Sequence, residues 1–421
     1  MANPLLVGVD PHRKTNTVCL MDGLGQELGK PLRVANNRPG TELLVQELRR
    51  VAREGNHDRI DIATEATGWY WFLLFRTLSE DPGLKLWPLG LYPFNPRRTA
   101  KYKEAYDDLD HEDKIDAFVI ADRLRMGRDL PGPFRKDDVY LPIRFLTRYR
   151  YHIMHNLARE KTYCLNILYL KASEYTRHDA DASGKLPPFS DTFGAASRAV
   201  IEEFASVDEI ASMPLEDLAA FIDAKGRGSF ADPTENAARL QRVARESYRL
   251  PEALQGPIQL ILKLSLQEIT SLERQSKCLD AAISKHIASL PQTLDTIPGL
   301  GPVLIAGIIS EIGDLSRFGD RAEAKVAKLA GFKWRRYQSG EFEAQDRELV
   351  RARNRYLRYY FCEAANAVRK KDAEYRAFYE RKYNEVRKHC HERAVVLTAR
   401  KLVRLVVRLL TTNQPYQPRR P

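Results

Sequence analysis

Hydrophobic and polar positions in the first 130 residues form short blocks that follow two different periodicities. Short apolar runs bounded by polar turns predict strands. These runs lie at 5–9, 17–21, within 26–35, at 60–65 and at 84–91, the last stopped by Pro93. Apolar residues at helical spacing predict helices at 39–53, 69–80 and 112–125. An α/β domain is therefore expected at residues 1–130.

The sequence pattern in the middle of the chain predicts a helical connector over 143–290. It follows a Pro-containing linker at 131–142 and contains two long helices, at 143–178 and 251–290. A heterogeneous helical insertion at about 180–245 separates them. Two long helices of mixed charge on either side of an insertion suggest an antiparallel coiled coil. Such a pair can join subunits or pack within one chain, and the pattern favours neither.

The last part of the chain is predicted to be mainly helical over 291–410, with a tail at 411–421. One helix is expected to carry a run of arginines, namely Arg351, Arg353, Arg355 and Arg358. The final nine residues, NQPYQPRRP, have the composition of a disordered segment. The fold class expected for the whole chain is therefore α/β plus α.

Four carboxylates stand at the ends of predicted elements in the α/β part. Asp10 ends the first apolar run and Glu65 ends the run at 60–65, whereas Asp113 and Asp116 share one face of a predicted helix. The order of three strands, helix, strand, helix, strand, helix is that of RNase H-like folds, which hold a divalent metal with carboxylates at these places. Without a metal, Asp10 can cap its turn, and aspartates are favoured at a helix start by the helix dipole.

The sequence IPGLGP at 297–302 is typical of a helix-hairpin-helix motif that binds a nucleic-acid backbone. Gly299 and Gly301 allow the main chain to approach a phosphate closely, and the N-terminus of the following helix favours an anion. An ordinary tight turn between two helices is the alternative.

Charge is concentrated near the C-terminus. The chain has a formal net charge of +11, and residues 333–421 alone hold 23 basic and 10 acidic residues. Such a field indicates a polyanionic partner, most often nucleic acid. Aromatic residues alternate with basic ones here, and the candidate nucleic-acid contacts are Lys333, Arg335, Arg336, Arg351, Arg353 and Arg355. Ser339, in a Gly-containing loop among these arginines, is a candidate nucleophile toward a phosphodiester.

Cysteine usage and hydropathy bear on the compartment. An odd number of cysteines, five, in a long chain argues against a disulfide framework and for a reducing compartment. No apolar run reaches the length of a membrane span. A cytoplasmic protein is therefore expected.

Taken together, the motifs resemble the DEDD transposases of bacterial insertion sequences, which are recombinases guided by a non-coding bridge RNA. The resemblance covers roughly 1–180 and 245–400, and the insertion near 180–245 departs from smaller members. It rests on Asp10 after an apolar run, IDIATEAT ending near Glu65, EDKIDA at 112–117, IPGLGP, EIGDLSRF at 311–318 and LAGFKWRRYQSG at 329–340.

The resemblance implies a RuvC-like domain in which Asp10, Glu65, Asp113 and Asp116 bind Mg²⁺. It also implies that Ser339, in the C-terminal domain, attacks DNA and forms a phosphoserine intermediate. The working unit would be a homo-oligomer, from dimer to tetramer, because the serine of one subunit completes the metal site of another. Donor and target DNA would be read by pairing with the bridge RNA, in a nucleoid-associated complex.

Three other functions fit parts of the sequence. A Holliday-junction resolvase or metal-dependent nuclease would use water and the four carboxylates alone, and would leave the loop of Ser339 unexplained. A nucleic-acid-binding scaffold with an inactive nuclease fold would be expected to lack a carboxylate. An actin-like phosphotransferase would require further glycine-rich phosphate loops, which residues 1–130 do not contain.

Overall fold

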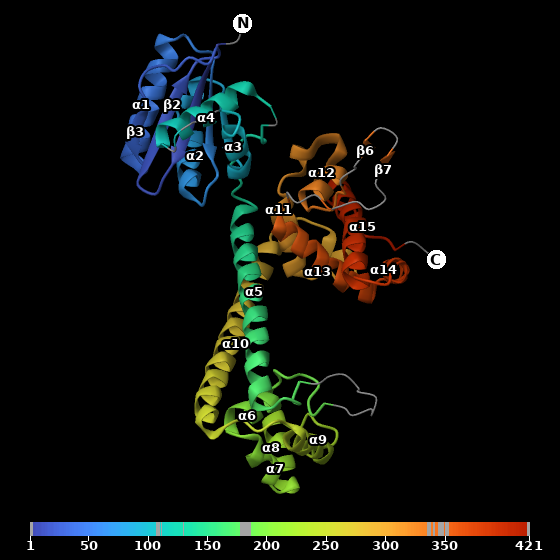
Figure 1. Cartoon of the computed structure of the whole chain (residues 1–421). Coiled ribbons are helices and arrows are strands. Elements are labelled where there is room, and N and C mark those ends of the chain that lie inside the picture. Colours follow the sequence, from blue (N-terminus) through green and yellow to red (C-terminus); the bar gives the residue numbers. More distant parts are fainter. Residues whose placement is uncertain are drawn as a thin grey trace. The chain divides into compact units, whose positions relative to one another are not determined.

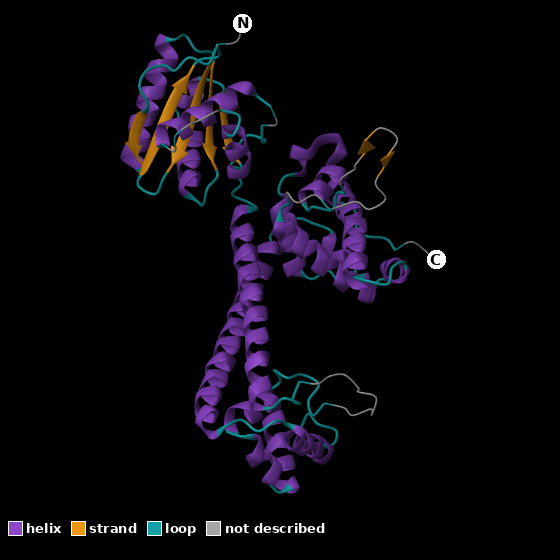
Figure 2. Ribbon diagram, in the orientation of Figure 1, coloured by secondary structure: helices purple, strands orange, loops and turns teal. Residues whose placement is uncertain are grey.

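The computed structural model describes residues 3–106, 110, 112–128, 130–176, 187–334, 338–339, 342–343, 349 and 353–418, and for 338–339 and 342–343 it describes the main chain only. The chain divides into two compact units, Met1–Asp138 and Val139–Pro421. The first is α/β and the second is mainly helical, so the expected α/β plus α class is confirmed (Figure 2). Among the described residues, no helix is long and apolar enough to cross a membrane.

A five-stranded mixed sheet forms the centre of the first unit (Figure 1). Its strands are β1 (Pro4–Pro11), β2 (Thr15–Met21), β3 (Leu32–Ala35), β4 (Arg59–Glu65) and β5 (Leu89–Phe94), in the order β3-β2-β1-β4-β5. Strands β1, β2 and β3 pair antiparallel, whereas β4 is parallel to β1 and β5 is parallel to β4. The C-terminal ends of β1, β4 and β5 therefore meet at one edge of the sheet.

Helices cover both faces of this sheet. They are α1 (Arg38–Glu54), α2 (Tyr70–Glu80), the 3₁₀ turn η1 (Leu84–Leu86), α3 (Pro96–Lys103) and α4 (Asp113–Met126). Leu5, Val7 and Val9 of β1 pack in one apolar cluster with α1 and α2. Leu6 packs in a second cluster with α4. Side chains alternate between the two faces of the sheet along a strand, so every second residue of a buried strand belongs to the same apolar cluster.

The strand predicted at 84–91 is wrong in position. Residues Leu84–Leu86 form the turn η1, and the strand begins at Leu89 and runs through Pro93 to Phe94. Proline is tolerated here because β5 lies at the edge of the sheet. On an edge strand, a residue without an N–H does not remove a hydrogen bond between strands. Helix α3 follows directly and was not expected from the sequence.

Two long helices, α5 (Leu141–Lys171) and α10 (Glu252–Ile287), lie side by side in the second unit (Figure 1). Their contacts show an antiparallel pair. Arg150 Nη2 donates to Asp280 Oδ2 at 3.2 Å, and Ser265 Oγ donates to Glu160 Oε1 at 2.6 Å. Both helices are close to the ranges expected for them.

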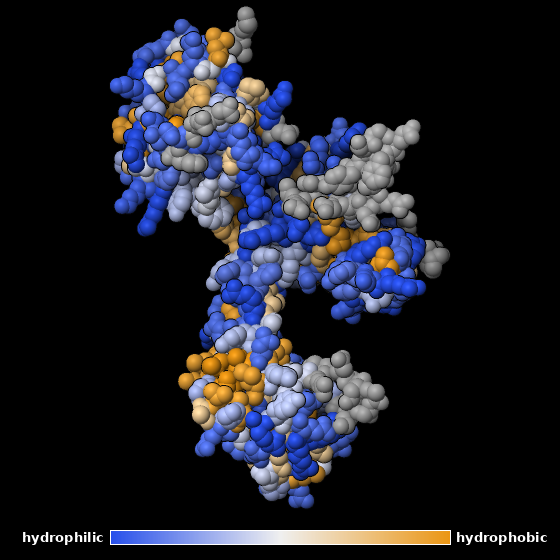
Figure 3. Space-filling view, in the orientation of Figure 1, coloured by the Kyte–Doolittle hydropathy of each residue, from blue (hydrophilic) through white to orange (hydrophobic). Residues whose placement is uncertain are grey.

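A small helical module fills the interval between α5 and α10. It comprises α6 (Ala195–Glu203), α7 (Val207–Ser212), α8 (Leu215–Gly226) and α9 (Pro233–Glu246). It shares one apolar core with the C-terminal half of α5 and the N-terminal half of α10, for example with Leu168 and Leu262. Apolar side chains gather on the surface at this end of the helix pair in Figure 3, and the exposed apolar residues of α5 and α10 include Tyr169, Leu170, Leu260 and Leu264.

The remaining elements of the second unit form a helical body around buried Tyr360 and Phe361. They are η2 (Leu294–Thr296), α11 (Pro302–Ile312), η3 (Leu315–Arg321), α12 (Ala322–Leu329), α13 (Arg355–Lys371), α14 (Ala373–Asn384) and α15 (Cys390–Thr412). A two-stranded ladder, β6 (Gln338–Ser339) and β7 (Phe342–Glu343), lies between α12 and α13.

Two expectations for this part are corrected. The arginines do not all share a helix, because Asn354 caps α13 and Arg353 precedes it, while Arg351 lies outside the described residues. The described part of the tail is exposed but is anchored at Tyr416. Tyr416 donates from its hydroxyl to Asp372 Oδ2 at 2.8 Å and from its amide to Thr296 Oγ1 at 2.8 Å. Residues 419–421 lie outside the described part.

Candidate active site

The strand alternation directs two of the four carboxylates to the face covered by α4. In β1 that face carries Leu6, Gly8 and Asp10, and in β4 it carries Ala63 and Glu65. Val9 pairs with Thr64, so Asp10 and Glu65 follow one position later on adjacent parallel strands. The two carboxylates therefore end neighbouring strands on the same face.

Close packing between β1 and α4 brings in the other two. A Cβ placed on Gly8 would lie 2.0 Å from the Ala117 carbonyl oxygen, which shows that α4 rests directly on the strand. Asp113 and Asp116 form the first turn of α4, immediately before Ala117. The first turn of α4 is therefore held beside the end of β1.

Three side chains in this region have the geometry of a metal site. Ligand atoms of Asp10, His12 and Asp113 all lie within 4.8 Å of one another. His12 Nδ1 is 3.5 Å from Asp10 Oδ2. His12 is not among the residues predicted from the sequence, because it follows the strand in a turn rich in polar residues. Its position next to Asp10 follows from the tight hairpin between β1 and β2.

Electrostatic shifts show that the carboxylates interact. Burial raises the pKa of the Asp10 carboxyl to about 6, and the negative charges of the other three carboxylates act in the same direction, whereas His12 opposes them. Burial also raises the pKa of Glu65, against a hydrogen bond from Thr67 Oγ1 to Glu65 Oε2 of 3.1 Å. Crowded, partly buried carboxylates of this kind are typical of functional sites.

The donor set fits a hard divalent cation. Carboxylate oxygens are the ligands that Mg²⁺ and Mn²⁺ prefer, and a positive ion offsets both the burial of Asp10 and the repulsion among the carboxylates. An imidazole is a weaker partner for Mg²⁺ than for transition metals, so His12 suits Mn²⁺ better. The residues present therefore fit a divalent-metal centre.

Lys103 is a second residue that the sequence did not reveal. It ends α3, and its Nζ lies 2.8 Å from Asp116 Oδ1. Helix α3 has a single buried side chain, that of Thr99, so its apolar pattern is too weak to be recognised in the sequence. Of the four carboxylates, Asp116 thus has a cationic neighbour from the protein itself.

The base of the segment that carries Ser339 is fixed by a buried ion pair in the second unit. Glu311 accepts from Arg148 Nε at 2.6 Å and Nη2 at 2.8 Å, and from Asn354 Nδ2 at 2.6 Å. The main-chain N–H of Asn354 donates to the Leu329 carbonyl oxygen at 2.8 Å. Ser339 pairs with Phe342 in the short ladder, and its side chain lies outside the described part.

The predicted nucleic-acid contacts are described only in part. Lys333, Arg353 and Arg355 are exposed, whereas Arg335, Arg336 and Arg351 lie outside the described residues. Gly299 has a φ of +89°, and a Cβ there would lie 2.8 Å from the Ala367 carbonyl oxygen of α13. Packing against α13 and the positive φ therefore explain why residue 299 is a glycine. A Cβ on Gly301 meets no atom within 4 Å, so that glycine faces open space.

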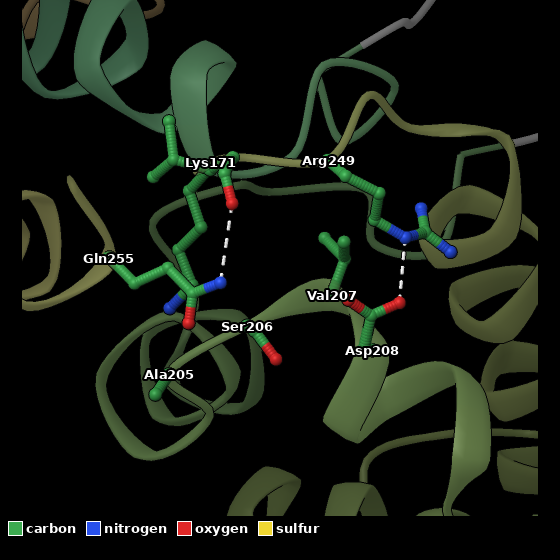
Figure 4. Close-up of a pocket in the computed structure, with 8 residues that line it drawn as sticks. Lys171, Ala205, Ser206, Val207, Asp208, Arg249 and Gln255 are labelled. Atoms are coloured by element: carbon green, nitrogen blue, oxygen red, sulfur yellow. Dashed lines mark hydrogen bonds and ion pairs between the residues drawn. The ribbon is translucent and has the colours of Figure 1, made fainter. Parts of the chain in front are cut away.

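A small pocket lies elsewhere, in the helical module near the end of α5 (Figure 4). It is lined by Lys171, Asp208 and Arg249 among others, and Arg249 Nε is 2.6 Å from Asp208 Oδ1. Burial lowers the pKa of Lys171 to about 8, and its Nζ donates to the Ile201 carbonyl at 2.7 Å. Each of these charged groups has a partner within the protein, so the pocket has the character of a structural polar core.

Comparison with known proteins identifies the family. Residues 7–170 match the DEDD transposase model of the IS110 group, and residues 291–380 match the IS116/IS110/IS902 transposase family model. The chain is 24% identical over 330 residues to a 44.8 kDa protein of insertion element IS116 from Streptomyces clavuligerus, covering 77% of this chain and 78% of that protein. It is 24% identical over 426 residues to a 42 kDa protein of insertion element IS900 from Mycobacterium paratuberculosis, covering 99% and 98%. The chain therefore belongs to the IS116/IS110/IS902 family of insertion-sequence transposases.

Proposed function

We propose that the protein is a bridge-RNA-guided DNA recombinase that moves an insertion sequence. The observation that carries this proposal is the meeting of Asp10, Glu65 and the first turn of α4 on one face of the sheet. The strand order β3-β2-β1-β4-β5 supports a RuvC-like domain, since it places the carboxylate-bearing strands β1 and β4 side by side. Membership of a transposase family supports DNA as the substrate.

Asp10, Glu65, Asp113 and Asp116 would hold the divalent metal, Mg²⁺ in the cell. When bound, the ion supplies positive charge that stabilises a transferring phosphate. The carboxylates themselves orient it, because two of them are fixed by the strands and two by the helix that rests on Gly8.

Ser339 would act as the nucleophile. Its hydroxyl oxygen forms a bond to phosphorus while the bond from phosphorus to the leaving deoxyribose oxygen breaks. The serine proton is transferred to the surrounding solvent, and the leaving oxygen takes up a proton from solvent. The product is a phosphoserine linkage and a free sugar hydroxyl, so the later rejoining step needs no external energy source. The same reaction run in reverse, with a hydroxyl from another strand, exchanges the strands.

The RNA partner and the oligomer complete the proposal. A guide that pairs with donor and target DNA reads sequence by base pairing, so the protein needs mainly contacts with backbone and shape. The exposed Lys333, Arg353 and Arg355 support such contacts in the second unit. The metal ligands and Ser339 lie in different units of the chain, which is compatible with a dimer or tetramer in which subunits share sites.

Covalent trapping tests this function. Wild-type protein incubated with guide RNA, donor and target DNA and Mg²⁺ should form a protein–DNA adduct that survives denaturing electrophoresis. The Ser339→Ala variant should form none while binding guide RNA as the wild type does. Ser289→Ala, at an exposed serine of the same unit, is the matched control and should keep the adduct.

A nuclease that uses water is the alternative, since all four carboxylates lie in the first unit. It predicts hydrolysed DNA ends that persist in the Ser339→Ala variant. Adducts that persist in that variant would instead remove Ser339 from the nucleophile role.

A further inference from the structure

The position of Lys103 distinguishes it from an ordinary surface lysine. Its side chain is 14% exposed, whereas that of its partner Asp116 is 42% exposed. Its ammonium lies 2.8 Å from Asp116 Oδ1 and donates a second hydrogen bond, of 3.2 Å, to the Asp110 carbonyl. The ammonium is thus directed at the carboxylate from inside the protein.

Helix α3 is fixed to α4 by polar contacts that lie beneath Lys103. Tyr102 Oη donates to Asp122 Oδ2 at 2.6 Å, and Arg123 Nη1 donates to Thr99 Oγ1 at 3.0 Å. Asp122 and Arg123 are both buried. On a helix held in this way, the ammonium of Lys103 is kept within hydrogen-bond distance of Asp116.

Three of the other ligand candidates form a compact group. Asp10, His12 and Asp113 lie together, and Asp116 is not part of that group. One cation position can therefore be built from these three side chains. Of the two carboxylates outside it, Glu65 and Asp116, the second already faces a fixed positive charge. In nucleases with two metal ions, the ions lie about 3.5–4 Å apart and stabilise the attacking and leaving oxygens.

We propose that Lys103 takes the place of a second metal ion, so that the site binds one divalent cation, at Asp10 and Asp113, with the Lys103 ammonium beside Asp116 as the other positive charge toward the phosphate. A lysine suits this role because its ammonium is a compact point charge with three donors. The inference rests on the proposed metal-dependent function and goes beyond it by setting the number of ions and adding a residue. It also narrows the ligand set proposed above, because Asp116 then contacts Lys103 and not the ion.

Counting bound Mn²⁺ on the full-length protein tests the inference without any activity measurement. Mn²⁺ is titrated by calorimetry, and free Mn²⁺ is followed by electron paramagnetic resonance. The wild type is expected to bind one ion with high affinity per chain. Lys103→Met should bind two, because Asp116 is released to a second ion. Lys103→Arg keeps the charge and should bind one.

Lys101→Met is the matched control, since Lys101 is an exposed lysine of the same helix and its loss changes the net charge equally. It should bind one ion with an affinity within about twofold of the wild type, because its charge is screened by solvent. Thermal unfolding of each variant establishes that the first unit remains folded, and Lys103→Arg keeps the test interpretable if Lys103→Met is unstable.

Two results overturn the inference in different ways. If the wild type binds one ion and Lys103→Met also binds one with unchanged affinity, or if the wild type already binds two, Lys103 does not replace a metal and the proposed function is unaffected. If the wild type binds no divalent ion, the metal-dependent function fails together with the inference.

Discussion

Gly8 and Ala117 set the distance between β1 and α4. The strand and the helix approach so closely that a Cβ on Gly8 would lie 2.0 Å from the Ala117 carbonyl oxygen and 2.5 Å from the Ala121 amide nitrogen. Both obstacles are main chain, which cannot rotate away as a side chain can. The separation of Asp10 from Asp113 depends on this contact. Asp10 closely follows Gly8 in β1, and Asp113 lies in the first turn of α4, just before Ala117.

Replacing Gly8 with alanine should therefore damage the metal site. The added methyl group must push α4 from the sheet, and we expect Mn²⁺ affinity to fall at least about tenfold and the melting temperature to decrease, as for other overpacked cores. Gly132→Ala is the control, since a Cβ there meets no atom within 4 Å. Wild-type Mn²⁺ affinity in Gly8→Ala would show that the contact does not position the carboxylates.

Acidity should weaken metal binding in a range set by Asp10. Its pKa is raised to about 6, mainly by burial, and a metal requires the ionised form. Mn²⁺ affinity should be nearly constant above pH 7 and fall by about tenfold per unit below pH 6. Titration calorimetry from pH 5 to 8 measures this, and a midpoint near pH 4 would contradict it.

The same shift has the opposite effect on the metal-free fold. The folded state binds a proton at Asp10 more tightly than the unfolded state, so the contribution of Asp10 to the free energy of unfolding decreases as pH rises from the unfolded pKa through about 6. Denaturant unfolding in the presence of a chelator should show this decrease in the wild type. Asp10→Asn has no such carboxyl and should show less of it.

Glu311 should be one of the most sensitive positions for stability in the second unit. Its removal leaves Arg148 without its carboxylate and frees the Asn354 side chain from its anchor. Breaking a fully buried pair from one side costs about 3–5 kcal/mol. The Arg148 side chain is 31% exposed, so Glu311→Ala should lower the free energy of unfolding by about 3 kcal/mol, the low end of that range. Glu268→Ala, at an exposed glutamate of α10, should change it by under about 0.5 kcal/mol. Similar values for the two variants would refute the prediction.

The two glycines of IPGLGP should behave differently. Gly299→Ala meets the Ala367 carbonyl and a positive φ, so it should destabilise the protein by more than about 1 kcal/mol whatever the motif binds. Gly301→Ala has space around it and should cost less than about 1 kcal/mol. If the turn contacts a phosphate, Gly301→Ala should still weaken DNA binding, as measured by fluorescence anisotropy. Unchanged affinity would leave the turn a purely structural element.

Strand periodicity explains how much of the site could be predicted. The apolar runs that end at Asp10 and Glu65 are long and regular, so their strands and the place of both carboxylates could be inferred. Lys103 could not, because α3 buries only Thr99 and shows no apolar face. The strand at β5 was misplaced since Leu84 and Leu86 are apolar, although only Leu84 is buried and both belong to a 3₁₀ turn.

His12 and Glu311 were missed for a different reason. His12 contacts a residue on the strand before its turn, and Glu311 contacts a residue far away in the sequence. The local pattern of apolar and polar residues does not predict either contact. Glu311 was read only as part of a motif, and its burial depends on Arg148, which comes from a helix 163 residues earlier. A charged residue inside an apolar helix such as α11 is the one signal that could have marked it.

The base of the Ser339 segment has a consequence for how this family can diversify. Gly331 and Arg353 stand next to each other, with a Cβ on Gly331 2.6 Å from that of Arg353, and Trp334 forms a bridge with Leu349. The chain thus leaves and re-enters the helical body at one point. The two ends of the segment are therefore held together by contacts of the body itself, and loops anchored in this way commonly tolerate changes in length. A graft made at Gly331 and Arg353 should therefore leave the helical body folded, and thermal unfolding of the chimera measures this.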